Sequence, residues 1–284
     1  MNDTVKRNIA KVCEVAMQEM EQDEEPSTEK LFKLFEKHLA KAVEVTAEGV
    51  NLHLDHQWEV TPELVMNLMF KNSIEKGLDL TQCAELFTVG VDGAGLAVVA
   101  DSFAALQQRI EQEKRISWED IYKYLHNDFE GVDGERVRAM MSSSQRYCQG
   151  NTLGDMWAKR ITELFTRLVK AQKMPEGRQL IPGWFSWSNT IHFGSTVGAT
   201  PNGRKKGTPI SHGANPNPGF RKDGAATAMS TGIAQVQPGY GNTAPLQLEF
   251  DPGITKEEGG VEKVLNLIKT HFALGGTLIN INIL

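Results

Sequence analysis

The sequence has 284 residues, of which 40% are hydrophobic and 23% are charged, proportions that are ordinary for a folded globular protein. Its net charge of −6 and isoelectric point near 5.7 exclude the broad basic face that nucleic acids require, since the one basic run, 204–206, is too short. Three widely spaced cysteines favour a reducing compartment over a disulfide framework. The sequence has no apolar signal core and no apolar run of membrane length, which predicts a cytoplasmic protein with no membrane partner.

Residues 1–174 are predicted to be mainly helical. Asn2 and Asp3 can cap a helix that ends before Pro26, and a longer helix is expected from about Thr28. The apolar residues of the first helix recur at helical spacing: Val5, Ile9, Val12, Ala16 and Met20.

Thr61 and Pro62 form a cap and first turn, which predicts a helix that Gly77 closes. A short apolar strand is expected over 86–91, and a buried helix of small residues over 95–110. Two further helices are expected, one after the cap Ser117 with Gly131 beyond its end and one over 152–173.

Residues 175–284 are richer in strands and loops. Strands are expected over 180–193 and 246–250, followed by a helix, the pair Gly275-Gly276 and a final apolar strand, TLININIL. Alternating helices and strands of this kind predict an α/β fold in which helices outnumber strands. Because the apolar final strand has no polar tail, we expect the chain to be truncated.

Three motifs imitate ligand sites. G-A-T-P-N-G-R-K-K from Gly198 resembles a phosphate-binding loop, but Arg204 and Lys205 replace the lysine and hydroxyl residues. Gly90, Gly93 and Gly95 lie between a strand and a helix in the wrong order for a dinucleotide fingerprint, so we interpret them as packing and turn residues. His53, Asp55 and His56 lack a further cluster of ligands, and no metal site is predicted.

Three segments carry a family resemblance. Residues 88–121 contain V-A-D-S followed by an apolar helix, 181–216 contain P-G-W-F-S and G-A-T-P-N-G-R-K, and 270–284 join a helix, Gly-Gly and an apolar strand. In this order and spacing they resemble the glycyl radical enzymes of the pyruvate formate-lyase and glycerol dehydratase type. The resemblance runs from about Asn8 to the last residue.

The resemblance implies part of a ten-stranded α/β barrel with many surrounding helices. It also implies the family's chemistry, in which an activating enzyme uses S-adenosylmethionine and an iron–sulfur cluster to make a radical on a backbone glycine. The radical passes to a cysteine, and the thiyl radical abstracts hydrogen from a small-molecule substrate. No cofactor is expected to bind this chain directly.

In the family the glycine lies in an R-V-x-G-[YFW] motif and the cysteine in a C-x-E loop, and the sequence imitates both. Cys83 and Glu85 match C-x-E, but the family's loop lies well upstream of the segment that they precede. Gly239 precedes a tyrosine without the required Arg and Val. We therefore interpret Cys83, Glu85 and Gly239 as structural, and expect the chain to lack both radical loops and the C-terminal glycine radical domain.

The predicted strand over 180–193 is expected to line the substrate cavity of the barrel. Alternation places Phe185, Trp187, Asn189 and Ile191 on one face and Ser186, Ser188, Thr190 and His192 on the other. Of these, the cavity candidates are Phe185, Trp187, Ser188, Asn189, Thr190 and His192. The aromatic set suits a bulky or apolar substrate and the polar set suits a polyol or an amino acid, and both choices stay open.

Gly198, Gly203 and Arg204 belong to the family's hallmark turn. Arg204 either anchors an anionic group or bridges backbone carbonyls of the irregular loop, and we favour the structural role.

The sequence thus predicts part of a radical lyase or dehydratase that is inactive alone, with an activating enzyme as partner. The alternative is a non-catalytic scaffold or degenerate relative that pairs with another chain. Unpaired strand edges of an incomplete barrel also predict that the isolated chain forms homo-oligomers or aggregates.

Overall fold

A three-stranded parallel sheet forms the centre of the molecule. The computed structural model describes residues 2–186, 188–217, 226–239 and 243–283. The sheet has the order β1 (Asn2–Asn8), β2 (Phe87–Ala94) and β3 (Arg178–Gly183), with β2 buried in the middle. The register runs from Asn2↔Thr88 to Asn8↔Ala94 and from Phe87↔Arg178 to Asp92↔Gly183, so the carboxyl ends of all three strands lie together.

The predicted start of the first helix is wrong. Residues Asn2–Asn8 form β1, and α1 (Ile9–Met20) begins only where the Asn8 side chain accepts the backbone N–H of Lys11 at 3.2 Å. Asn2 and Asp3 therefore cap no helix. The local capping signal is overridden because β1 supplies the backbone partners that one edge of the buried strand β2 needs.

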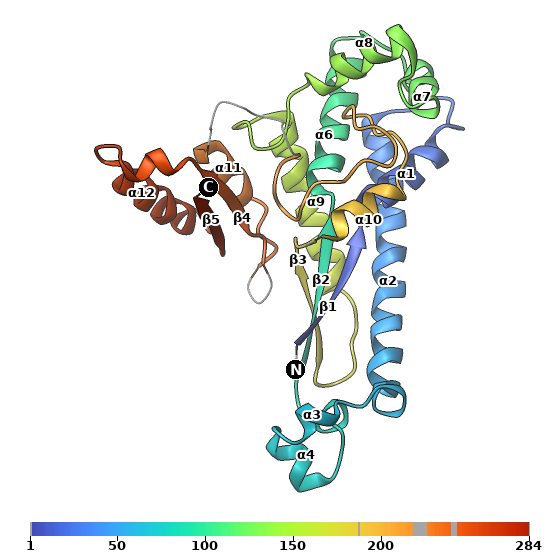
Figure 1. Cartoon of the computed structure of the whole chain (residues 1–284). Coiled ribbons are helices and arrows are strands. Elements are labelled where there is room, and N and C mark those ends of the chain that lie inside the picture. Colours follow the sequence, from blue (N-terminus) through green and yellow to red (C-terminus); the bar gives the residue numbers. More distant parts are fainter. Residues whose placement is uncertain (1, 187, 218–225, 240–242, 284) are drawn as a thin grey trace.

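Four helices build the main core (Figure 1): α1, α2 (Thr28–Val60), α6 (Leu96–Leu106) and α9 (Leu153–Lys170). Every residue of α6 is buried, as the run of small and apolar residues predicts. The ring of Phe103 stacks on Trp157 at 4.8 Å between centroids, and Phe32 of α2 lies 5.5 Å from Trp157. This aromatic cluster joins α2, α6 and α9 into one core.

In place of the single helix predicted to end at Gly77, the segment after α2 contains two short helices, α3 (Leu64–Asn67) and α4 (Lys71–Lys76), and a third, α5 (Leu80–Cys83), follows Gly77. Gly77 ends α4 with φ +64°, so its predicted role as a helix terminator is confirmed. No residue of α3 is buried. This segment lies at the amino end of the sheet, beside the start of β2 (Figure 1).

The upper part of the molecule in Figure 1 contains α7 (Trp118–His126) and α8 (Gly131–Ser142), and a π-helical turn, η1 (Gln107–Gln112), extends α6. Ser117 caps α7 as predicted, accepting the N–H of Asp120 at 3.0 Å. Gly131, with φ +80°, lies beyond the end of α7 and is also the first residue of α8, a helix that the sequence did not predict.

The C-terminal part holds a second sheet, in which β4 (Leu246–Phe250) and β5 (Ile279–Ile283) pair in parallel. The crossover passes through η2 (Pro252–Thr255) and α12 (Gly260–Ala273), and α12 packs against α11 (Ala226–Ala234). Asn215 joins this unit to the rest of the molecule, since its side chain donates to the Pro245 carbonyl and accepts from the Gln247 N–H, each at 3.0 Å.

The predicted α/β class is confirmed, as are the strands over 246–250 and in TLININIL. All named strand pairs in the described residues are parallel, the arrangement expected when helices connect successive strands. The division at residue 174 stays a prediction, and Leu180 and Trp184 beyond it belong to the same core as α6 and α9. In the part of the chain that the structure describes, no helix is long and apolar enough to cross a membrane.

Candidate functional site

The carboxyl edge of the three-stranded sheet is the candidate site, because ligands of parallel α/β sheets bind outside the carboxyl ends of the strands. The chain leaves β3 at Gly183 and crosses this edge, and α10 (Asn189–Ser195) lies beside the ends of β1 and β2 (Figure 1). The Asn8 side chain at the end of β1 donates to the Phe193 carbonyl at 3.1 Å. This bond ties α10 to the sheet edge.

Trp184 follows β3 directly, and its ring packs against Gly93 near the carboxyl end of β2. Its side chain is fully buried and its ring lies 4.9 Å from that of Phe165. A Cβ at Gly93 would come within 2.1 Å of the Trp184 ring, so glycine at position 93 leaves the space that the indole fills. Gly90 and Gly93 lie inside β2 and Gly95 has φ +93° where α6 begins, which agrees with packing and turn roles and leaves no dinucleotide loop there.

Phe185, the residue after Trp184, contacts His212. Phe185 is half-buried, and its ring meets the imidazole of His212 edge-on at 5.8 Å. The buried Ser186 hydroxyl accepts the N–H of Gly213 at 2.8 Å and so fixes the second segment, 211–215, against the first. Desolvation by burial lowers the pKa of His212, which keeps the imidazole neutral near pH 7.

Two polar atoms at this edge have no hydrogen-bond partner within the described residues: Trp184 Nε1 and His212 Nδ1. Buried polar atoms are nearly always paired with protein, water or ligand. The edge therefore combines aromatic side chains with a buried donor and a buried imidazole nitrogen that have no partner within the described residues.

The predicted strand over 180–193 is wrong beyond Gly183. The described residues from Asn189 to Ser195 form α10, so the proposed alternation of two faces does not exist there. Two tertiary hydrogen bonds hold this segment as a helix. The Asn8 side chain donates to the Phe193 carbonyl, and Arg204 donates to the Gly194 carbonyl at 2.9 Å.

The remaining cavity candidates are consequently dispersed. Ser188 and His192 are exposed, and Asn189 and Thr190 are half-buried on α10. Trp187 lies outside the described residues. Of the five candidates that the structure describes, only Phe185 has a ring contact with His212, which the strand-based argument had missed because His212 lies twenty-seven residues away.

Arg204 holds the hallmark turn together. Its Nη1 donates to the Gly198 carbonyl at 2.6 Å, and its Nη2 donates to the carbonyls of Gly194 and Val197 at 2.9 and 3.2 Å. Its Nε donates to the Thr208 carbonyl at 3.1 Å. Burial lowers the Arg204 pKa to about 10, which leaves the guanidinium charged. These contacts are the structural role that the sequence favoured.

Gly203 of the same turn cannot be replaced without strain. Gly203 has φ +84°, and a Cβ there would meet the Ser142 hydroxyl at 2.0 Å and the Arg138 carbonyl at 2.9 Å. The described residues 205–217 form no helix, so a phosphate-binding loop lacks the helix N-terminus that it needs.

The residues that imitate the family's two radical motifs lie away from the candidate site. Cys83 is buried at the end of α5, where its thiol contacts the Ser73 hydroxyl at 3.2 Å, and Glu85 is exposed before β2 begins. Both therefore lie at the amino end of the sheet, opposite the candidate site. Gly239 has φ +120° and lies near the Lys170 ammonium.

The histidine cluster of α2 is engaged in surface ion pairs. Asp55 accepts from Arg178 at 2.7 Å, and His56 lies 3.6 Å from Glu59. Among the described residues, no group of three or more His, Cys, Asp or Glu side chains is arranged to hold a metal ion.

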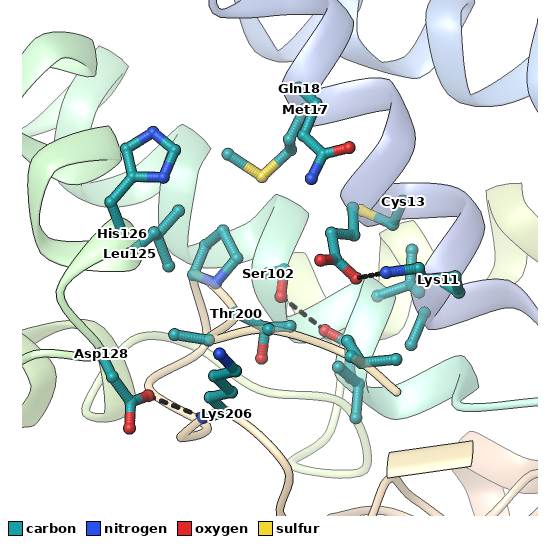
Figure 2. Close-up of a pocket in the computed structure, with 18 of the residues that line it drawn as sticks. Lys11, Cys13, Met17, Gln18, Ser102, Leu125, His126, Asp128, Thr200 and Lys206 are labelled. Atoms are coloured by element: carbon teal, nitrogen blue, oxygen red, sulfur yellow. Dashed lines mark hydrogen bonds and ion pairs between the residues drawn. The ribbon is translucent and has the colours of Figure 1, made fainter. Parts of the chain in front are cut away.

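A second hollow, a cavity of about 350 Å³, lies between α1, α6, α7 and the segment 195–206 (Figure 2). The hallmark turn forms one of its walls, through Gly198 to Pro201. Sequence reasoning missed this cavity because its lining comes from four separate stretches of the chain.

The comparisons with known proteins agree with this fold. Residues 1–194 match the family model of pyruvate formate lyase-like proteins, and the chain belongs to this family of glycyl radical enzymes. It is 24% identical over 262 residues to a trans-4-hydroxy-L-proline dehydratase of Clostridioides difficile, an alignment that covers 90% of this chain and 32% of the relative. It is 26% identical over 178 residues to an isethionate sulfite-lyase of Oleidesulfovibrio alaskensis, covering 62% of this chain and 21% of the relative.

Among solved structures, the chain is similar to the glycerol-bound B12-independent glycerol dehydratase of Clostridium butyricum, with a TM-score of 0.84 at 24% identity. This match covers 99% of the chain and 38% of the dehydratase. The fold is thus that of part of a glycyl radical enzyme barrel. The chain spans less than two fifths of the length of these relatives.

Proposed function

We propose that this chain forms part of the substrate-binding barrel of a glycyl radical dehydratase or lyase that acts on a small organic molecule. The observation that carries the proposal is the carboxyl edge of the parallel sheet, where Trp184, Phe185 and His212 meet. Family membership supports the same reaction class, since the relatives named above are dehydratases and a lyase.

The chemistry of this edge suits a hydroxylated or amino-acid substrate. A neutral imidazole at His212 can donate one hydrogen bond and accept another without adding charge, and the Trp184 Nε1–H is a second donor. The aromatic wall excludes water, which protects reactive intermediates from side reactions. We propose His212 and Trp184 as substrate-positioning residues and Phe185 as a packing residue of the cavity.

The radical itself is proposed to come from outside these 284 residues. The sequence contains one C-x-E tripeptide, at Cys83, and no R-V-x-G-[YFW] motif. Cys83 is buried at the end of the sheet opposite the candidate site. We therefore propose that the chain is inactive alone and works with a polypeptide that carries both motifs. An activating enzyme that uses S-adenosylmethionine and an iron–sulfur cluster would install the radical, in an anaerobic cytoplasm.

Electron paramagnetic resonance tests this proposal. The 284-residue chain, treated anaerobically with a reduced family activating enzyme and S-adenosylmethionine, is expected to give no glycyl radical signal. Co-expression with neighbouring open reading frames that encode the two motifs is expected to give a complex with the signal and with turnover of a small polyol, hydroxyproline or isethionate. In that complex, His212→Asn is expected to raise KM, whereas Cys83→Ser leaves turnover unchanged. A signal from the chain alone, or loss of turnover in Cys83→Ser, contradicts the proposal.

The alternative function is a non-catalytic scaffold that pairs with another chain. The observation that favours it is the exposed apolar surface of α3 and α4, where Leu64, Leu68 and Met69 are each more than 70% exposed. A stable complex that carries no radical and turns over no substrate would favour this alternative.

A further inference from the structure

The cavity between α1, α6 and α7 has the size and layout of a ligand site. Its volume of about 350 Å³ is within the range of small-molecule sites. It is lined by α1, α6, α7 and the segment 195–206 (Figure 2), and none of Trp184, Phe185 and His212 lines it. The inference drawn from it does not rest on the proposed function.

Part of the cavity lining is apolar and uncharged. Burial raises the pKa of the Cys13 thiol to about 12, so the thiol is not ionised. The Tyr122 hydroxyl, which also lines the cavity, is already used in a bond to the Met17 carbonyl at 3.0 Å. Aliphatic side chains extend this part of the lining: Ala10, Val98, Val99 and Leu125. This part of the cavity suits a small apolar group.

The charged groups lie around these apolar walls, and most of them are paired. Lys11 pairs with Glu14 at 2.9 Å, and His126 contacts Glu21 at 2.8 Å. Two groups differ. Lys206 Nζ has no carboxylate within 4.0 Å among the described residues, and no cation there pairs with the Asp128 carboxylate.

Asp128 and Lys206 are nevertheless held on one side of the cavity. The Asp128 carboxylate accepts the backbone N–H of Lys206 at 2.6 Å, so the two side chains start from adjacent positions. Figure 2 shows the Lys206 side chain rising from this contact toward Thr200. An anion and a cation thus line the same cavity without forming an ion pair with each other.

We propose that this cavity binds a free α-amino acid with a small aliphatic side chain. The α-ammonium group pairs with Asp128, the α-carboxylate pairs with Lys206, and the side chain enters the apolar part beside Met17 and Val99. A zwitterion fits because each of its two charges can meet one of these two groups, which line the same cavity. A ligand with one charge would leave one of them unpaired.

Titration calorimetry on the full 284-residue chain tests the proposal with three probes of similar shape: L-norvaline, pentylamine and pentanoate. L-Norvaline is expected to bind at least about tenfold more tightly than either single-charge probe, because charge-assisted hydrogen bonds are the strong ones. Equal affinity for the three probes, or no binding of L-norvaline at millimolar concentration, overturns the proposal.

Matched variants locate the site. Asp128→Asn keeps an oxygen acceptor for the Lys206 N–H and suits the backbone at φ +55°, while it removes the charge. Asp133→Asn makes the same change at an exposed position of α8 that pairs with Arg136. Lys206→Met and Lys205→Met form the second pair, since Lys205 contacts Glu135 outside the cavity.

Asp128→Asn and Lys206→Met are each expected to weaken L-norvaline binding by about tenfold. Asp133→Asn and Lys205→Met are expected to leave it unchanged. Binding that survives both cavity variants, or that falls equally in the two control variants, overturns the assignment. Circular dichroism of each variant shows that the fold is retained.

Discussion

The indole of Trp184 occupies the space in which a side chain at Gly93 would lie. A Cβ built on Gly93 would meet Trp184 Cζ3 at 2.1 Å and Cε3 at 2.5 Å. Gly93 lies in the central strand and Trp184 follows β3 directly, so this contact fixes how the chain crosses the carboxyl edge of the sheet. The position of Phe185 and His212 depends on it.

Gly93→Ala is therefore expected to destabilise the chain by about 1–3 kcal/mol, because the added methyl overpacks a rigid ring. Urea unfolding followed by fluorescence measures the change. In the double variant with Trp184→Leu, the two effects are expected to be less than additive. Gly49→Ala is the control: this glycine lies in α2 with nothing within 4 Å of its Cβ position, so alanine is expected to stabilise the helix. Full additivity of Gly93→Ala and Trp184→Leu would contradict the contact.

Arg204→Lys is expected to destabilise the chain by about 2 kcal/mol or more, since an ammonium cannot reach the four carbonyls that the guanidinium holds and leaves buried acceptors unpaired. Hydrogen exchange should show faster exchange in the segment 194–208. The neighbouring Lys205→Ala, which removes only an ion pair with Glu135, serves as the comparison and is expected to change stability little. Equal effects of the two substitutions would argue against the structural role of Arg204.

His271 is expected to make stability fall as the pH falls below about 6.5. The side chain is fully buried, its Nδ1 lies 3.1 Å from the Ser230 hydroxyl, and desolvation lowers its pKa from the ordinary value of 6.5. The unfolded chain therefore binds a proton at a higher pH than the folded chain does. The stabilising contribution is complete above pH 6.5 and is lost as the pH falls toward the lowered pKa.

Urea midpoints at pH 7.5 and 5.5 measure this dependence. His271→Gln should reduce the difference between the two pH values, although it also lowers stability at both. His192→Gln changes an exposed histidine and should leave the difference as it is. An unchanged pH dependence in His271→Gln would show that other groups cause it.

Self-association of the isolated chain is expected through α3 and α4. Five large apolar side chains there are more than 60% exposed: Leu64, Val65, Leu68, Met69 and Ile74. Such a surface drives association in water. Light scattering should show oligomers that the double substitution of Leu68 and Met69 by Lys reduces. Substitution by Lys of Val132, which is exposed on α8, should not reduce them. A monodisperse monomer of the unsubstituted chain at high concentration would contradict the expectation.

Helices whose signals are local were predictable from sequence. The cap at Ser117, the terminator at Gly77 and the apolar run of α6 each act through neighbouring residues, and the structure has them where expected. The strand β1 and the helix α10 were missed because partners distant in the sequence determine them. The strand β2 pairs with β1, and Asn8 and Arg204 capture carbonyls of α10.

The candidate site shows the same division. Phe185 could be named from its place in the strand predicted over 180–193, whereas His212 is brought to it by the bond between Ser186 and Gly213. His192 and Ser188 were named from an alternation that ends when the strand ends.

The family could be recognised from the amino-acid sequence, because the hallmark turn needs particular residues: glycine at positive φ at Gly203 and a five-donor side chain at Arg204. The α/β class followed from the periodicity of the long segments. Which side chains meet depends on tertiary packing. Three features join residues from separate elements: the approach of Trp184 to Gly93, the contact of Phe185 with His212, and the cavity lined by Asp128 and Lys206. Contacts of this kind depend on how the elements pack, and no local pattern encodes them.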